Sequence, residues 1–544
     1  MMSETFPYVA KNEKAYKSNP AIQLFGSRLY VDQTQTEFLV EFLLILASSK
    51  KIEGNGSFDS PLPPIEILHS WSNSQLDYST KARLNLKLFS FLGASRLESR
   101  HKVHRDHHRD LLNILKSRIR MTGVGHKDDV VRTLENLFLG FQGAGVGRTW
   151  CAQSFLPICP GFLAGETIWN ETKAKATPPA HWQDMIESLN TYLTMNKHRF
   201  LARGGEVLYL QICNALRKDK ETIHKWVEES GVMLDSSLDN NEQDPEWLHA
   251  ELVQELSGLM YKCPQAITEL AEFIDSGIES ETALKTDYHN DSPRYVTAGW
   301  CPAESWQEGY LFAVDLLRLC KANLDVIDRI YLLESACAMQ VLRSLAFQSA
   351  RYTTTNHFTA WPGYRLAVSA PEENRPIVKR VSQQTVKMIE KQIFQAIRNE
   401  NKGIVLPEGD DARNNALKEA DRRYAGKLFV GLAKRLGLII PRRGAGARFV
   451  LNEQLLRFLV LTVVPRGGRI TFDRFKEIVE NRYGLVFDAD GIRRASEWLA
   501  DGNRVYLPND TDNWLQEMLE AAGFLIRLSD SCALVVEDPT VGGR

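Results

Sequence analysis

Apolar residues recur at helical spacing over most of the chain. One early segment places them three and four positions apart, at Phe38, Leu39, Phe42, Leu43 and Leu46. This spacing predicts a helix, with Thr36 as a suitable N-cap. Later patterns predict two long helices over 305–322 and 325–350, and the second is apolar on both faces between Ala336 and Phe347. Because a helix that is apolar all round is buried, we expect these two helices at the centre of a bundle.

The C-terminal part changes from helical spacing to short apolar runs. An amphipathic helix is predicted over 416–436, and Gly437 fits its C-cap. The runs LIIP (438–441) and RFVL (448–451) flank a Gly-rich basic turn, RRGAGA (442–447). Two short apolar runs around such a turn predict a β-hairpin. A helix followed by a hairpin is typical of the end of a winged helix-turn-helix.

A weaker copy of this pattern follows 86 residues later. LAKRLGLII (432–440) aligns with MLEAAGFLI (518–526), and FVL (449–451) is echoed by ALVV (533–536). Internal similarity of this kind predicts two related helix–hairpin modules. Three helices are expected between them, over 453–464, 471–483 and 490–500, the last two capped by Thr471 and Asp490.

These patterns predict a mainly α, multi-domain protein with winged-helix-like modules at its C-terminal end. The stretch EESGVMLDSSLDNNEQDPE is acidic and polar, and a Gly/Asn/Asp-rich stretch covers 399–411. Such stretches are typical of linkers and surface loops. The predicted order is an N-terminal helical domain (1–230), an acidic linker or loop (231–246), a central helical domain (247–405), a basic winged-helix-like module (412–506) and a second, acidic helix–hairpin module (507–544).

Composition is that of a globular protein, but the charge is unevenly distributed. Hydrophobic residues make up 44% of the 544 residues and charged residues 25%, which excludes a disordered or low-complexity chain. The formal net charge is only −2. Residues 413–504 nevertheless hold 19 Lys and Arg against 10 Asp and Glu, a net of +9, while residues 507–544 hold two against seven. A basic module is therefore expected on an acidic body.

The basic residues of this module fall on and around the predicted hairpin. Lys427, Lys434 and Arg435 lie on the preceding helix, and the turn region carries Arg442, Arg443 and Arg448. A basic hairpin tip beside a basic helix suits contacts with phosphates, so we predict binding of duplex DNA without sequence preference. The alternative is a solvated charged face, or a docking surface for an acidic protein.

Two further motifs only partly match known sites. QGAGVGRT (142–149) resembles a phosphate-binding loop, with Gly143, Gly145, Gly147, Arg148 and Thr149 as its candidate residues. It departs from a Walker A loop because Gln142 and Arg148 stand where glycine and lysine are needed. In HKVHRDHHRD (101–110), a helix would place three candidate metal ligands on one face, at His101, His104 and His108. We expect a solvated helix there, and no metal or cofactor in the protein.

Cysteine usage and the N-terminal residues favour a cytoplasmic location. None of the eight cysteines forms a CxxC pair, so we expect buried thiols in a reducing compartment. The sequence MMSETFPYVAKNEK has no apolar core of a signal peptide, and the apolar run 38–47 is too short to span a membrane.

Two stretches resemble segments of accessory proteins of bacterial anti-phage defence islands. They are QLFGSRLYVDQTQTEFLVEFLLIL (23–46) and QGAGVGRTWCAQSFLPI (142–158), and residues 435–461 add to the resemblance. It implies a cytoplasmic bacterial protein that works beside a helicase, nuclease or modification enzyme, and it carries over no catalytic residue. We therefore expect a non-enzymatic DNA-binding or scaffolding subunit of a defence complex. The alternatives are a nuclease or degenerate nucleotide-binding enzyme of the same system, and a winged-helix transcription regulator.

Overall fold

The computed structural model of the chain is mainly helical, with five small sheets among the residues that it describes. These residues are 4–9, 19–31, 33–71, 73–79, 204–233, 241–261, 296–353, 361–499, 511–529 and 532–538, with four short pieces at 116–117, 126–129, 168–169 and 193–194. The helices predicted between residues 80 and 200 lie outside them.

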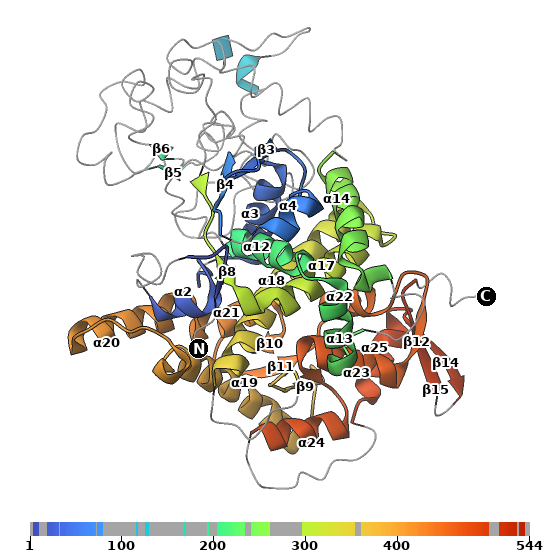
Figure 1. Cartoon of the computed structure of the whole chain (residues 1–544). Coiled ribbons are helices and arrows are strands. Elements are labelled where there is room, and N and C mark those ends of the chain that lie inside the picture. The colour runs from blue at the N-terminus through green and yellow to red at the C-terminus, as the bar shows by residue number, and fades with distance from the viewer. Residues whose placement is uncertain are drawn as a thin grey trace.

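Helices α17 (Trp306–Lys321) and α18 (Val326–Tyr352) occupy the centre of the molecule, as predicted (Figure 1). Helices α3 (Gln35–Ala47) and α12 (Gly204–Leu216) pack against them. In the described part of the chain, α18 is the one helix long and apolar enough to cross a membrane, and 94% of its apolar window is buried inside the protein. Its apolar character therefore reflects a place in the core.

The N-terminal segment and the residues after 296 form one packed unit. Strand β1 (Thr5–Phe6) pairs with β8 (Cys301–Pro302). A second sheet has the order β3-β2-β4-β7, in which β4 (Leu76–Ser79) pairs with β7 (Val296–Thr297). The other elements of this half are β2 (Ser49–Ile52), β3 (Ser57–Phe58), α2 (Pro20–Phe25), α4 (Ile65–Ser70), α13 (Lys220–Ser230) and α14 (Pro245–Tyr261).

The stretch predicted as an acidic linker enters the core where the structure describes it. Glu242, on the short helix η2 (Asn241–Gln243), is 9% exposed and forms an ion pair with Arg318 of α17 at 2.5 Å. The boundary predicted at 231–246 thus does not separate two cores. The acidic residues of this stretch therefore include one that is buried in an ion pair, Glu242, as well as exposed ones such as Glu246.

The C-terminal half begins with a mixed sheet in the order β10-β11-β9-β13. The predicted hairpin is confirmed: β10 (Ile439–Ile440) and β11 (Arg448–Val450) pair antiparallel. Strand β9 (Leu366–Ser369) then pairs with β11 and with β13 (Leu485–Val486), both in parallel. Helices α19 (Pro376–Ala396), α21 (Gly426–Leu436) and α24 (Ala489–Trp498) pack around this sheet.

The helix predicted over 416–436 is broken into three pieces. Helix α20 (Asp410–Glu419) continues into a π-helical turn, η5 (Ala420–Tyr424), before α21 begins. The turn is held by the N-terminal segment, because Val31 donates its backbone N–H to the Arg423 carbonyl at 2.7 Å and the rings of Tyr30 and Tyr424 meet edge to face. A contact between distant segments therefore overrides the helical pattern.

The second helix–hairpin module repeats the first in its backbone hydrogen bonds. It consists of α25 (Asn513–Ala521), β14 (Leu525–Ser529) and β15 (Cys532–Val536), joined by β12 (Arg469–Thr471) in the antiparallel order β12-β15-β14. The N–H of Leu438 donates to the Ala433 carbonyl, and 86 residues later Phe524 donates to Leu519. Gly437 and Gly523, also 86 residues apart, share a φ of 79°. The predicted repeat is confirmed at this level.

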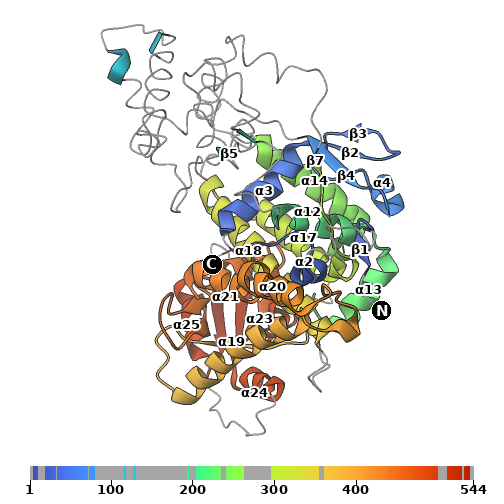
Figure 2. The ribbon, with the colours of Figure 1, turned by 90° about the vertical axis from the view of Figure 1, so that its left-hand side faces the viewer.

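A buried charged network joins the two halves of the molecule. Asp315 of α17 accepts from Arg343 of α18 at 2.9 Å and from Arg482 of α23 (Phe472–Tyr483) at 2.6 Å. Arg318 and Arg482 both donate to the carbonyl of Thr462, in α22 (Glu453–Val463). The main hydrophobic core takes residues from both halves, from Phe6 to Val535, and a smaller cluster lies between α19, α24 and strands β9 and β13. The domain boundary predicted between 405 and 412 therefore does not separate two hydrophobic cores. In Figure 2, α18 lies between the N-terminal and the C-terminal elements.

Candidate nucleic-acid interface

The turn of the first hairpin presents two arginines to solvent. Residues 441–446, between β10 and β11, are all exposed, and they include Arg442 and Arg443. No residue in the described ranges forms an ion pair with either guanidinium. The turn lies beside α19, because the Gln383 side-chain amide reaches the Gly446 carbonyl at 3.5 Å.

Helix α19 adds a row of cations that the sequence analysis missed. Arg380, Lys387 and Lys391 are exposed, whereas Val381, Ile389 and Ile393 on the opposite side are buried against the sheet. The one acidic residue of the helix is Glu390. The sequence does place these basic residues on the polar side of an amphipathic helix. They lie before residue 413, however, and so outside the segment 413–504 in which the excess of basic residues is found.

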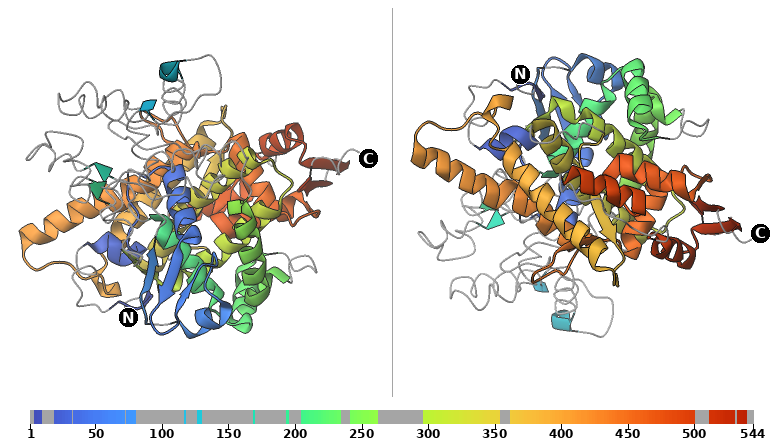
Figure 3. Two further views of the ribbon diagram at one scale, coloured as in Figure 1. Left: turned by 90° about the horizontal axis from the view of Figure 1, so that it is seen from above. Right: turned by 90° about the horizontal axis from the view of Figure 1, so that it is seen from below.

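Together the helix and the turn form what we call the basic face, defined by Arg380, Lys387, Lys391, Arg442 and Arg443. Gln383 lies one helical turn from both Arg380 and Lys387, so its contact with Gly446 brings the helix cations next to the hairpin turn. The yellow-orange helix on the near surface of the right-hand view in Figure 3 is α19. A helix and a projecting turn side by side can contact phosphates along more than one strand of a duplex.

Arg448, predicted to contact phosphate, instead belongs to the fold. Its side chain is 9% exposed, and its guanidinium donates to the carbonyls of Ala370, at 2.9 Å, and Pro371. Burial lowers the pKa of Arg448, and nearby Glu373 opposes that effect. The arginine anchors β11 to the chain that follows β9, so we remove it from the predicted interface.

Arg435 also has a structural position, which corrects a second prediction. Its guanidinium donates to the carbonyls of Gln33 at 2.8 Å and Val31 at 3.2 Å, and so fixes α21 to the N-terminal segment. Lys434, on the same helix, is half-buried and close enough to Glu390 to oppose the rise that burial causes in the pKa of that carboxyl. Of the three predicted helix cations, only Lys427 is exposed.

An exposed aromatic side chain marks the C-terminal end of α19. Phe394 is 48% exposed, and the guanidinium of Arg398 lies 3.4 Å from its ring centroid. Arg398 also forms a two-point ion pair with Asp421 of η5, which holds it in that position. The basic face therefore ends in a rigid cation–ring stack at the surface.

The second hairpin has a different surface. Its one basic side chain in the described strands, Arg527, is paired with Glu520 at 2.8 Å. Beside it Leu528 is 60% exposed. The two modules therefore share a backbone design but differ in the charge of their hairpins.

The other candidate sites of the sequence fall outside the described residues. These are the loop residues Gly143, Gly145, Gly147, Arg148 and Thr149, and the histidines His101, His104 and His108. Within the ranges that the structure describes, no group of three His, Cys, Asp or Glu could hold a metal ion. Four of the five described cysteines are buried, and burial raises the pKa of Cys301 to about 12, so its thiol stays protonated.

Comparisons with known proteins do not identify a relative of this chain. No family model, curated protein or solved structure matches the chain. The function is therefore inferred from the chemistry of the basic face itself.

Proposed function

We propose that this chain is a non-enzymatic DNA-binding subunit that contacts the phosphates of duplex DNA through the basic face. The observation that carries the proposal is the gathering of Arg380, Lys387 and Lys391 of α19 beside Arg442 and Arg443 of the hairpin turn. All five are exposed, and none forms an ion pair with a described residue. Because these five side chains form no ion pair within the described fold, their charges are available to the phosphates of DNA.

The arrangement of the modules supports a winged-helix interpretation. In the second module the three strands are antiparallel in the order β12-β15-β14, with a helix directly before the hairpin. The first module has the corresponding order β9-β11-β10, although β9 runs parallel to β11. In winged helices the hairpin reaches a groove or backbone beside the one that the helix contacts. We place the turn of the first module in the role of the wing. Helix α19, which lies beside the turn, supplies the helix cations in place of α21, the helix directly before the hairpin.

The chemistry of the face favours DNA phosphates over base edges. Exposed lysine and arginine side chains neutralise phosphate charge without reading sequence, and five such contacts give a slope of about −4.5 in log K against log salt. Affinity should then fall by about 500-fold between 50 and 200 mM salt.

We further propose that the protein works as a scaffolding subunit of a bacterial anti-phage defence complex. The resemblance of residues 23–46 and 142–158 to defence-island accessory proteins motivates this. Outside 413–504 the chain holds 47 basic and 58 acidic residues. The acidic second module and exposed Leu528 are compatible with docking of a helicase, nuclease or modification enzyme.

The test is a titration of the full-length protein with fluorescent 20-base-pair duplexes of two unrelated sequences, across a salt series. We expect equal affinity for both duplexes and a salt slope between about −3 and −4.5. A flat salt response, or a strong preference for one sequence, would contradict phosphate contact by this face.

A further inference from the structure

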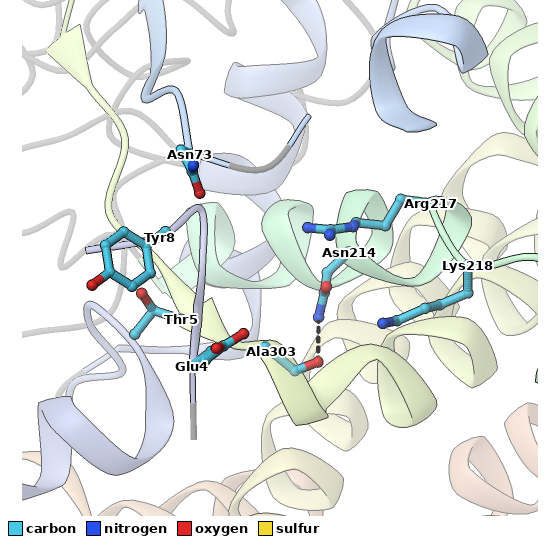
Figure 4. Close-up of a pocket in the computed structure, with 8 residues that line it drawn as sticks. All are labelled: Glu4, Thr5, Tyr8, Asn73, Asn214, Arg217, Lys218 and Ala303. Carbon is cyan, nitrogen blue, oxygen red and sulfur yellow. Dashed lines mark hydrogen bonds between the residues drawn. The ribbon is translucent and has the colours of Figure 1, made fainter. Parts of the chain in front are cut away.

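A polar cavity of about 410 Å³ lies between the N-terminal strand and the end of α12, far from the basic face in the chain. Figure 4 shows Glu4 and Tyr8 on one side, and Asn214, Arg217 and Lys218 on the other. Its volume is within the range of sites that hold small molecules.

Two adjacent cations at the end of α12 define one side of the cavity. The Arg217 guanidinium lies 4.8 Å from the ring centroid of Phe6, and the Lys218 ammonium lies 5.8 Å from that of Trp306. No ion pair joins either of them to a residue that the structure describes. Partial burial lowers the pKa of both side chains; Cys301 and Glu4 oppose that effect at Arg217, whereas the charge of Arg217 adds to it at Lys218. Two half-buried cations next to each other are stabilised when an anion occupies the space before them.

The opposite side of the cavity suits a ligand with an aromatic ring and hydrogen-bond donors. Tyr8 is 47% exposed, and its ring can stack with an aromatic group of a ligand. The carboxylate of Glu4 faces the cavity and can accept hydrogen bonds from ligand hydroxyl or amino groups (Figure 4). On the side of the two cations, Asn214 is already fixed by its hydrogen bond to the Ala303 carbonyl at 2.9 Å, so that side is preorganised.

We propose that this cavity binds a nucleoside monophosphate, with its phosphate on Arg217 and Lys218 and its base against Tyr8. The phosphate relieves the crowding of the two cations, and Arg and Lys donate charge-assisted hydrogen bonds to it. The Glu4 carboxylate already acts on Arg217, where it opposes the fall that burial causes in the pKa, and in the proposed complex it accepts hydrogen bonds from the ribose hydroxyls. The site is independent of the DNA-binding face, since it shares no residue with it.

The test is calorimetric titration of the full-length protein with each of the four ribonucleoside monophosphates, the matching nucleosides and inorganic phosphate. We expect at least one monophosphate to bind at least about tenfold more tightly than its nucleoside and than inorganic phosphate. Equal binding of inorganic phosphate would mean an adventitious ion only and would overturn the proposal. So would the absence of binding by all four monophosphates.

Variants locate the binding in the cavity. Arg217→Gln/Lys218→Gln should weaken the monophosphate by at least about tenfold, and Tyr8→Leu, a surface change, should weaken monophosphate and nucleoside alike. The matched control Lys51→Gln/Lys225→Gln removes two exposed charges elsewhere and should bind like wild type. If the Arg217→Gln/Lys218→Gln variant is unstable, the Tyr8→Leu variant still tests the proposal. An unchanged affinity of Tyr8→Leu for the monophosphate would contradict stacking of the base on Tyr8.

Discussion

At the scale of single residues, Glu334 of α18 is a buried carboxylate that has a hydrogen bond with Thr36. It is 8% exposed, and burial raises its pKa to about 7, against the opposing effect of a hydrogen bond with Thr36. The raised pKa means that the folded protein keeps this proton at pH values where the unfolded chain has released it. The unfolded state is therefore favoured as pH rises through the range from about 4.5 to 7.

We predict that Glu334→Gln stabilises the protein at high pH. The amide keeps the shape of the protonated acid and cannot ionise, so the gain over wild type should grow from near zero at about pH 4 to about 1–3 kcal/mol at about pH 8. Urea unfolding across this pH range measures it. A gain that is constant with pH would show that Glu334 does not titrate in this range.

Single residues also show where sequence reasoning succeeds and fails. Thr471 and Gly437 cap their helices as predicted. Helix α3, however, is capped by Thr34 through a reciprocal bond with Glu37, and α24 by Asp488, each two residues before the predicted cap. Several polar residues near a helix start satisfy the same pattern, and the backbone conformation selects among them.

At the scale of elements, the hairpins were predictable because their signals are local. A Gly-rich turn between two apolar runs specifies both strands and their register. The parallel pairing of β9 with β11 and β13 joins residues about 80 and 120 positions apart, and no periodicity in the sequence encodes it. The structural roles of Arg435 and Arg448 could not be predicted for the same reason, because the carbonyl groups to which they donate lie in distant segments of the chain.

We predict that Gly437→Ala destabilises the first module by about 1–3 kcal/mol. Gly437 has a φ of 79°, and an added Cβ would lie 2.4 Å from the side-chain nitrogen of Asn452, which itself donates to the Leu436 carbonyl. The control Gly426→Ala meets no atom within 4 Å and should change stability by less than about 0.5 kcal/mol. Equal urea midpoints for the two variants would contradict this role of Gly437.

At the scale of the whole molecule, the central helices were predicted, but the separation into domains was not upheld by the packing. Polar stretches such as 231–246 have the composition of linkers, and composition does not show that Glu242 pairs with Arg318. The halves are joined instead by charges buried between α17, α18 and α23. Such long-range ion pairs are invisible in the sequence of either partner.

We predict that Asp315→Ala destabilises the protein by about 3–5 kcal/mol, because it leaves Arg343 and Arg482 buried without their carboxylate. The loss should appear as one cooperative transition in calorimetry, since both halves share the core. The control Asp328→Ala breaks an exposed pair with Arg457 and should cost less than about 1 kcal/mol. Two separate transitions in the Asp315 variant would show that the halves fold independently.

The central claim is that the basic face, and not overall charge, binds DNA. The direct measurement compares duplex affinity of the full-length protein at 50 mM salt for Arg442→Glu/Arg443→Glu and for the control Arg466→Glu/Arg469→Glu. The control reverses two exposed arginines at and just before β12, with the same change in net charge. We expect the first variant to lose at least about tenfold in affinity with an unchanged melting temperature, and the control to bind within about twofold of wild type. Equal affinities for both variants would contradict the assignment of the face.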